Sequence, residues 1–215
     1  MTKRPAPQVS SRKQPQQARS TELVAAILQA AVQVLAREGA QRFTTARVAE
    51  KAGVSVGSVY QYFPNKAAIL FRLQSDEWMQ TTEMLRGILE DTRKPPLVRL
   101  RDMVHAFIRS ECEEAGMRVA LSDAAPLYRD APEAQAVKAS TEKLYLDFMR
   151  EALPKVPPRA RAVAADLVIK TLSTVGKEFS ESPRTVAEIR SYADAMADMF
   201  CAYLAQIAER HAMRS

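Results

Sequence analysis

Apolar residues recur at helical spacing along almost the whole chain from residue 21 onward. In the first such segment, about 21–38, Ile27, Ala31 and Leu35 fall on one face, and Gly39 follows as a stop signal. No segment shows the regular alternation of apolar and polar residues that marks a half-buried strand. The pattern therefore predicts an all-α protein.

Prolines and a glycine separate the later helices. A long helical segment lies between Pro64 and the pair Pro95-Pro96, and its apolar residues occupy more than one face, as expected of a helix that joins two domains. The later breaks fall at Gly116, Pro126, Pro132 and the PKVPP stretch at 154–158. Further helices are predicted at about 97–115, 133–152, 159–180 and 185–211.

Residues 53–57, GVSVG, match the Gly-x-Ser-x-Gly pattern of a nucleophile elbow, in which a strained turn presents a serine for acyl transfer. That turn needs a strand before the serine, whereas the preceding TTARVAEKA has the period of a helix. A helix, a turn and a second helix fit better. Thr44 or Thr45 caps the first helix, Gly53 supplies a left-handed turn residue, and Ser55 caps the second helix. A serine hydrolase would require a sheet that the sequence does not encode, so we expect no enzyme.

Positive charge is concentrated in the first third of the chain, although the net charge is only +6. Residues 1–70 hold ten bases and three acids, and the other 145 residues hold 21 bases and 22 acids. A localised basic region is what a polyanion-binding module requires. Five of these bases precede residue 20, in a stretch rich in proline and glutamine, which predicts a disordered basic arm over 1–20. A solvated tail without function is the alternative explanation of those five.

Several residues around the predicted turn suit contact with nucleic acid. Tyr60 and Tyr62 could donate hydroxyls to phosphates, and Lys66 adds a positive charge at the start of the next helix. Each also has an ordinary explanation, because tyrosines near helix ends usually pack and exposed lysines are usually only solvated. Their coincidence with a helix-turn-helix pattern in the basic third favours DNA binding.

The stretch TTARVAEKAGVSVGSVYQYFPNKAAIL resembles the DNA-binding signature of the TetR family of bacterial transcriptional regulators. This resemblance implies a DNA-binding domain at 21–80, with its motif at 44–63, followed by a helical effector-binding and dimerisation domain at 81–215. It implies DNA contacts at Thr45, Ser55, Val56, Gly57, Ser58, Tyr60 and Lys66, with Arg47 and Gln61 as further contacts. Arg19 or the arm before it would reach the minor groove or the backbone. Because the second helix of the motif carries no arginine, we expect phosphate contacts and shape readout more than bidentate guanine contacts.

The resemblance also implies a dimer and a ligand pocket in the second domain. A symmetric four-helix interface is expected from 159–180 and 185–211, because the last helix is apolar over a wide arc. The interface residues are predicted to be Leu167, Thr171, Val175, Ile189, Met196, Phe200, Tyr203 and Ile207. The pocket is predicted to be lined by Trp78, Met103, His105, Phe107, Met117, Tyr145, Phe148 and Met149. Each of these pocket residues has plain core packing as its alternative, and His105 could be a structural residue.

The resulting hypothesis is a homodimeric repressor that binds a palindromic double-stranded DNA operator and leaves it when a small-molecule effector binds. An activator of the same fold stays open, as does a helical protein-binding adaptor, whose complexes would lack a steep salt dependence. Cys112 and Cys201 have no metal-ligand spacing, so we expect packed thiols and neither a metal nor a cofactor. No apolar run approaches the roughly 18 to 20 residues of a membrane span, and no signal peptide is evident, which predicts a cytoplasmic protein.

Overall fold

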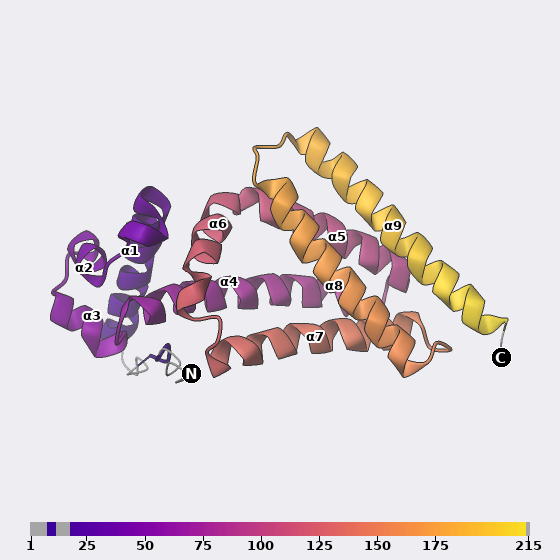
Figure 1. Ribbon diagram of the computed structural model, residues 1–215, viewed down its shortest axis with the longest axis horizontal. Helices are drawn as coiled ribbons and strands as arrows, with labels where there is room; N and C mark the ends of the chain where they lie inside the picture. The colour runs from indigo at the N-terminus through magenta and orange to yellow at the C-terminus, as the bar shows by residue number, and fades with distance from the viewer. Residues whose placement is uncertain (1–7, 12–17, 214–215) are drawn as a thin grey trace, which may run out of the picture. The chain divides into compact units, whose positions relative to one another are not determined.

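The computed structural model describes residues 8–11 and 18–213 of the chain (Figure 1). Regular structure within these two ranges is helical and includes no strand, which confirms the predicted all-α class. The elements are α1 (Ala18–Arg42), α2 (Thr45–Ala52), α3 (Val56–Tyr62), α4 (Lys66–Leu89), α5 (Pro96–Glu113), α6 (Ala115–Ala124), the 3-10 helix η1 (Ala125–Leu127), α7 (Pro132–Ala152), α8 (Pro158–Ser180) and α9 (Val186–Ala212).

The chain forms two compact units. The first consists of Met1–Met79 with Gly116–Val137, and the second of Gln80–Ala115 with Lys138–Ser215. The sequence predicts one uninterrupted second domain over 81–215, so the return of the chain to the first unit is a correction. Its physical reason is burial, because apolar side chains of this returning segment complete the first core. They are Leu121, Ala124, Tyr128, Ala131 and Ala134.

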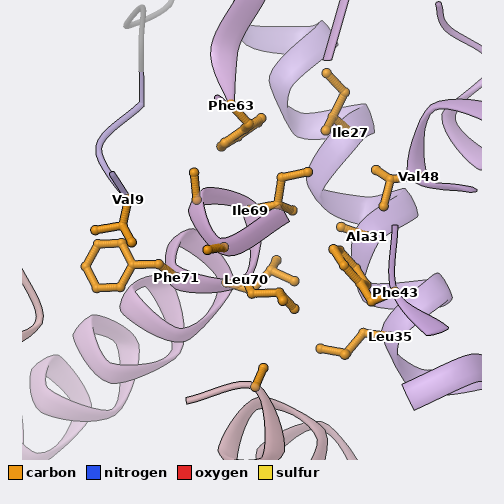
Figure 2. Close-up of a cluster of buried hydrophobic side chains, with 14 of the residues drawn as sticks. Val9, Ile27, Ala31, Leu35, Phe43, Val48, Phe63, Ile69, Leu70 and Phe71 are labelled. Atoms are coloured by element: carbon orange, nitrogen blue, oxygen red, sulfur yellow. The ribbon is translucent and has the colours of Figure 1, made fainter. Parts of the chain in front are cut away.

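The core of the first unit forms around the apolar face of α1. Ile27, Ala31 and Leu35 on this face are fully buried, as the helical spacing predicts, and Figure 2 shows them turned toward Phe43 and Ile69. The helix is interrupted at Gly39, where φ is 71°, a conformation that favours glycine.

Helix α1 also bears on the question of a membrane. The stretch Arg19–Arg42 is long and apolar enough, by length and composition, to cross one, whereas no such stretch is expected from the sequence. However, Ile27 and Leu35 of this helix have no exposed surface and lie in the first core. The apolar face of this helix therefore packs against protein in the first unit.

Residues 8–11 depart from the predicted disordered arm over 1–20. They have no regular secondary structure, yet Val9 is only 2% exposed and belongs to the first core. Figure 2 shows its side chain beside the ring of Phe71. Helix α1 takes up the last three residues of the predicted arm, and the other parts of it, 1–7 and 12–17, lie outside the described residues. One valine in a polar stretch carries too weak a pattern to predict this packing.

Hydrogen bonds add to the apolar contacts that hold α6 and η1 on α4. The buried Tyr128 hydroxyl donates to Leu121 O at 2.8 Å and lies 3.2 Å from Gln74 Oε1. Gln74 Nε2 donates to Glu77 Oε2 at 2.8 Å, and Arg118 Nη1 lies 2.8 Å from Glu77 Oε1. This chain of polar groups links two segments of the first unit that are more than 40 residues apart in sequence.

Tyr128 and Tyr145 provide a matched pair of buried hydroxyls. Tyr145 in the second unit donates only weakly, to the thioether Sδ of Met103 at 3.4 Å. We expect Tyr128→Phe to lower the free energy of unfolding by about 1 to 3 kcal/mol, because a buried carbonyl loses its donor. Tyr145→Phe should cost less than about 0.5 kcal/mol. Urea unfolding followed by circular dichroism measures both variants, and equal losses would contradict this assignment of the hydroxyls.

The same pair predicts how stability changes at alkaline pH. Burial raises the pKa of both phenols above the ordinary value of 10.0. As the pH rises, the unfolded chain therefore loses these protons before the folded chain does. The contribution of the two protonated phenols to folding stability is complete below about pH 10 and decreases as the pH rises further. Each phenylalanine variant should lose less stability than the wild type above that pH, in the same urea measurement.

The core of the second unit forms where α5 lies against both α8 and α9. Helices α8 and α5 pack closely at Gly176, where an added Cβ would lie only 3.1 Å from Phe107 Cε1 of α5. The buried aromatic residues of this core are Phe107, Tyr145, Phe148 and Phe200. The two predicted packed thiols, Cys112 and Cys201, are unpaired and half-buried.

Among the charged residues that the structure describes in the second unit, Arg99 is the most deeply buried, with 1% of its surface exposed. Its guanidinium donates to Leu89 O, the last carbonyl of α4, and forms an ion pair with Glu151 of α7. It also lies 5.7 Å from the centre of the Phe148 ring. Arg99 thereby joins the end of α4 to α5 and α7.

Candidate nucleic-acid interface

Helices α2 and α3 form the helix-turn-helix that the sequence predicts. Thr44 is extended, and its hydroxyl accepts a hydrogen bond from Arg47 N at 3.2 Å, so Thr44 rather than Thr45 caps α2. Gly53 ends the helix with φ 68° and ψ 29°, and its N–H bonds to the carbonyls of Ala49 and Glu50. This confirms the left-handed turn predicted for Gly53.

Ser55 is the N-cap of α3. Its Oγ accepts from Ser58 N at 3.0 Å and lies 2.8 Å from Ser58 Oγ. The element before it is helix α2, not a strand, and the turn between them contains Gly53. The GVSVG stretch is therefore a helix-capping sequence, and it lacks the strand that a nucleophile elbow needs.

One face of α3 is exposed and begins with small side chains. Val56 is 39% and Tyr60 is 40% exposed, and Gly57 and Gln61 are exposed as well. Tyr62, in contrast, is buried at 6% exposure, so its predicted phosphate contact is corrected. The reason is the helical period, since two residues of about 100° each carry Tyr62 to the opposite side from Tyr60.

Further polar groups predicted to contact DNA lie on α2, α3 and at the start of α4. Thr45 Oγ1 and the Tyr60 hydroxyl are 3.2 Å apart, so a hydrogen bond between α2 and α3 orients the phenol. Lys66 is the first residue of α4, which is capped by Asn65 Oδ1 accepting from Ala68 N at 2.9 Å. The Tyr60 hydroxyl can donate to a phosphate oxygen, and the Lys66 ammonium group lies at a capped helix start, which also suits phosphate.

Arg47 lies differently from the other predicted contacts. Its guanidinium forms an ion pair with Glu38 and donates to Arg42 O at 3.0 Å. In the structure this side chain therefore joins the end of α1 to α2, and its predicted DNA contact would require it to leave both partners. Glu38 is nine residues away, with the break at Gly39 between them, so helical spacing does not reveal the pair.

The predicted pocket residues are divided between the two units. Trp78 and Met117 pack against the first core, whereas the other apolar members belong to the second. His105 Nε2 lies 3.1 Å from Asp194 Oδ1, which gives it a partner on α9. The five members in the second core are Met103, Phe107, Tyr145, Phe148 and Met149.

The structure also separates the two apolar faces of α9. Met196, Phe200 and Ile207 are buried within the second unit, with at most 7% exposure, so their assignment to a dimer interface is corrected. Both faces carry the same helical period, and only packing distinguishes them. The half-buried predicted interface residues are Thr171, Val175, Ile189 and Tyr203. The exposed apolar residues of α8 and α9 include Val163, Leu167 and Met199.

Two family profiles match the chain. Residues 27–73 match "Bacterial regulatory proteins, tetR family", and residues 95–207 match "Tetracyclin repressor-like, C-terminal domain". The second match covers slightly more than half of the chain, and the two leave the first 26 residues unmatched.

The chain is also similar to individual proteins and solved structures. The nucleoid occlusion factor SlmA of Vibrio campbellii is 36% identical over 107 residues, which are 48% of this chain and 53% of that protein, so the chain spans about half the length of this relative. NalD, the secondary repressor of the MexAB-OprM multidrug efflux pump in Pseudomonas aeruginosa, has a TM-score of 0.61 at 18% identity, covering 84% of this chain and 96% of NalD. A SmeT–triclosan complex has a TM-score of 0.61 at 19% identity, covering 85% and 91%.

The two solved structures show the shared fold, and the profile matches extend over both units. The helix-turn-helix geometry of α2 and α3 lies inside the matched residues 27–73. The chain belongs to the tetR family of bacterial regulatory proteins and is a DNA-binding transcriptional regulator.

Proposed function

We propose that this regulator is a repressor that binds a palindromic duplex operator as a homodimer and leaves it when a small-molecule effector binds. The observation that supports the DNA contact is the exposed face of α3, where Gly57 leaves the backbone of the first turn uncovered and Tyr60 follows on the same helix. The proposed contacts are Thr45, Ser55, Val56, Gly57, Ser58, Tyr60, Gln61 and Lys66. Such a protein would act in the cytoplasm, where bacterial DNA lies, and needs no catalysis.

Homodimerisation is supported by the exposed apolar residues of the second unit. Val163 and Leu167 are one helical turn apart on α8 and are 57% and 45% exposed, and Met199 on α9 is 51% exposed. A stripe of this kind is stabilised when a second copy covers it. Two copies related by a two-fold axis would present two α3 helices to two half-sites about one turn of DNA apart.

Regulation by an effector is supported by the second core and by one structural neighbour. Met103, Met149 and Phe148 are the kind of side chain that repacks around a ligand. The SmeT structure contains triclosan, and NalD is a repressor. Release would follow if the effector binds preferentially to a conformation with weak operator affinity. Whether bound protein represses or activates depends on where the operator lies.

A random-sequence selection with the full-length protein tests the proposal directly. Binding of the selected duplex is then measured by fluorescence anisotropy across a salt series. Lys66→Ala should lower the salt slope by about one, because one phosphate contact is lost. Tyr60→Phe should weaken binding by roughly tenfold, the size of a hydrogen bond to a charged group. Lys155→Ala, at an exposed position of the second unit, is the matched control and should change nothing.

Equal, weak binding to selected and scrambled duplexes would contradict operator recognition. A compound that binds the protein but leaves operator affinity unchanged would not be the proposed effector. A shallow salt dependence would favour the protein-binding adaptor instead.

Nucleoid occlusion is a second candidate, because it is the role named for the Vibrio campbellii relative. Both candidates bind DNA, so in-cell occupancy distinguishes them. A repressor should occupy promoters whose transcripts rise when the gene is deleted. A nucleoid occlusion factor should occupy many sites without that rise, and its deletion should disturb division over the nucleoid.

A further inference from the structure

Residues Gln8–Ser11 form a short strap on the first unit, and we call this segment the N-terminal strap. It precedes α1 and lies outside residues 27–73, which match the family profile, so family membership does not account for it. Three contacts hold it in place: one apolar, one to the start of α4, and one to the start of α7.

The apolar contact is made by Val9. Its side chain is 2% exposed and joins the first core beside Phe71, which is itself 8% exposed (Figure 2). Phe71 lies in the second turn of α4, five residues after Lys66. Removing the valine side chain would therefore uncover apolar surface next to the beginning of α4.

The second contact is made by Asn65, which uses both ends of its side-chain amide. Oδ1 accepts from Ala68 N at 2.9 Å and caps α4, while Nδ2 donates to Gln8 O at 3.1 Å. The strap is thus hydrogen-bonded to the residue that immediately precedes Lys66. The amide orientation is the one that satisfies both partners.

The third contact is made by Ser10. Its hydroxyl donates to Glu133 in the first turn of α7, and this bond lowers the pKa of the Glu133 carboxyl. Glu133 belongs to the part of α7 that lies in the first unit. The strap therefore contacts the N-terminal ends of two long helices, α4 and α7, whose first residues are more than 60 residues apart in sequence.

We infer that the N-terminal strap is a positioning element for DNA binding: by holding Asn65 and Phe71 at the N-terminal end of α4, it places Lys66 for contact with the phosphate backbone. This inference rests on the proposed function, in which Lys66 is a DNA contact. It makes Val9 and Asn65 positioning residues, since neither needs to touch DNA itself.

The test uses the full-length protein and the duplex selected by the wild type. Val9→Ser removes the apolar contact. Asn65→Ser keeps a side-chain oxygen for capping but removes the donor to Gln8 O. Each variant should bind the duplex roughly tenfold more weakly, the size expected for coupling between neighbouring groups, and each should lower the salt slope by about one. Val9→Ile, which keeps an apolar side chain, should retain the wild-type operator affinity and salt slope. Ser11→Ala, at an exposed strap position, should leave both unchanged as well.

A double-mutant cycle with Lys66→Ala separates positioning from general stability. If the strap acts through Lys66, neither Val9→Ser nor Asn65→Ser should weaken binding further in the Lys66→Ala background. Fully additive losses, or an unchanged salt slope in both single variants, would overturn the inference. Thermal unfolding confirms that each variant is folded at the assay temperature, and Asn65→Ser keeps the test valid if Val9→Ser does not fold.

Failure of the proposed function gives a different result. In that case the wild-type protein itself would not prefer its selected duplex over a scrambled one. If the wild type prefers its selected duplex, and Val9→Ser and Asn65→Ser bind that duplex as tightly as the wild type does, only the strap inference is rejected.

Discussion

Gly57→Ala is expected to weaken operator binding by roughly tenfold to a hundredfold, while the protein stays at least as stable as the wild type. The two effects have opposite signs because they depend on different surroundings. Within the free protein, a Cβ at Gly57 would meet only Ser55 Oγ, at an ordinary 3.6 Å. Alanine in a helix stabilises by about 0.5 to 1 kcal/mol relative to glycine. In the operator complex, the same methyl group would occupy space between the α3 backbone and the groove.

Gly87→Ala is the matched control for this prediction. Gly87 is an exposed helical glycine in the second unit, and a Cβ there would have no neighbour within 4 Å. It should show the gain in stability without a change in operator affinity. Thermal unfolding and fluorescence anisotropy on the selected duplex measure both quantities. If Gly57→Ala binds as tightly as Gly87→Ala, the backbone of α3 does not approach the DNA closely.

Glu151→Ala is expected to lower the free energy of unfolding of the second unit by about 3 kcal/mol. The Glu151 side chain is 47% exposed, but its partner Arg99 is 1% exposed. Removing the carboxylate therefore leaves a buried guanidinium without its anion, and that uncompensated charge accounts for most of the cost. This cost is at the low end for buried ion pairs, because water can partly replace a carboxylate that was itself half-exposed.

A second substitution at the same site checks the cause. Arg99→Met removes the buried charge and keeps apolar volume next to Phe148. The double variant Arg99→Met/Glu151→Ala should therefore be more stable than Glu151→Ala alone, although in the double variant Leu89 O loses the donor that Arg99 provides. Urea midpoints of the wild type and the three variants measure this. A double variant less stable than Glu151→Ala would mean that Arg99 stabilises by contacts other than the ion pair.

The DNA-binding motif could be predicted from the sequence because its signals are local. The cap at Ser55 and the left-handed Gly53 depend on residues within one or two helical turns. Helical spacing also predicted that α1 buries one face, as Ile27 shows. These features follow from backbone geometry and hydrogen bonds between near neighbours, so a single sequence determines them.

Other features were decided only by tertiary structure, because they depend on residues that are distant in sequence. The spacing of α9 predicts two apolar faces, but only packing on α5 buries Phe200 and leaves Met199 exposed. The return of Gly116–Val137 to the first unit likewise depends on a core assembled from both ends of that unit. Val9 is buried because Phe71, more than 60 residues later, lies beside it. A one-dimensional pattern shows that a side chain needs burial, and the folded chain decides which distant partner provides it.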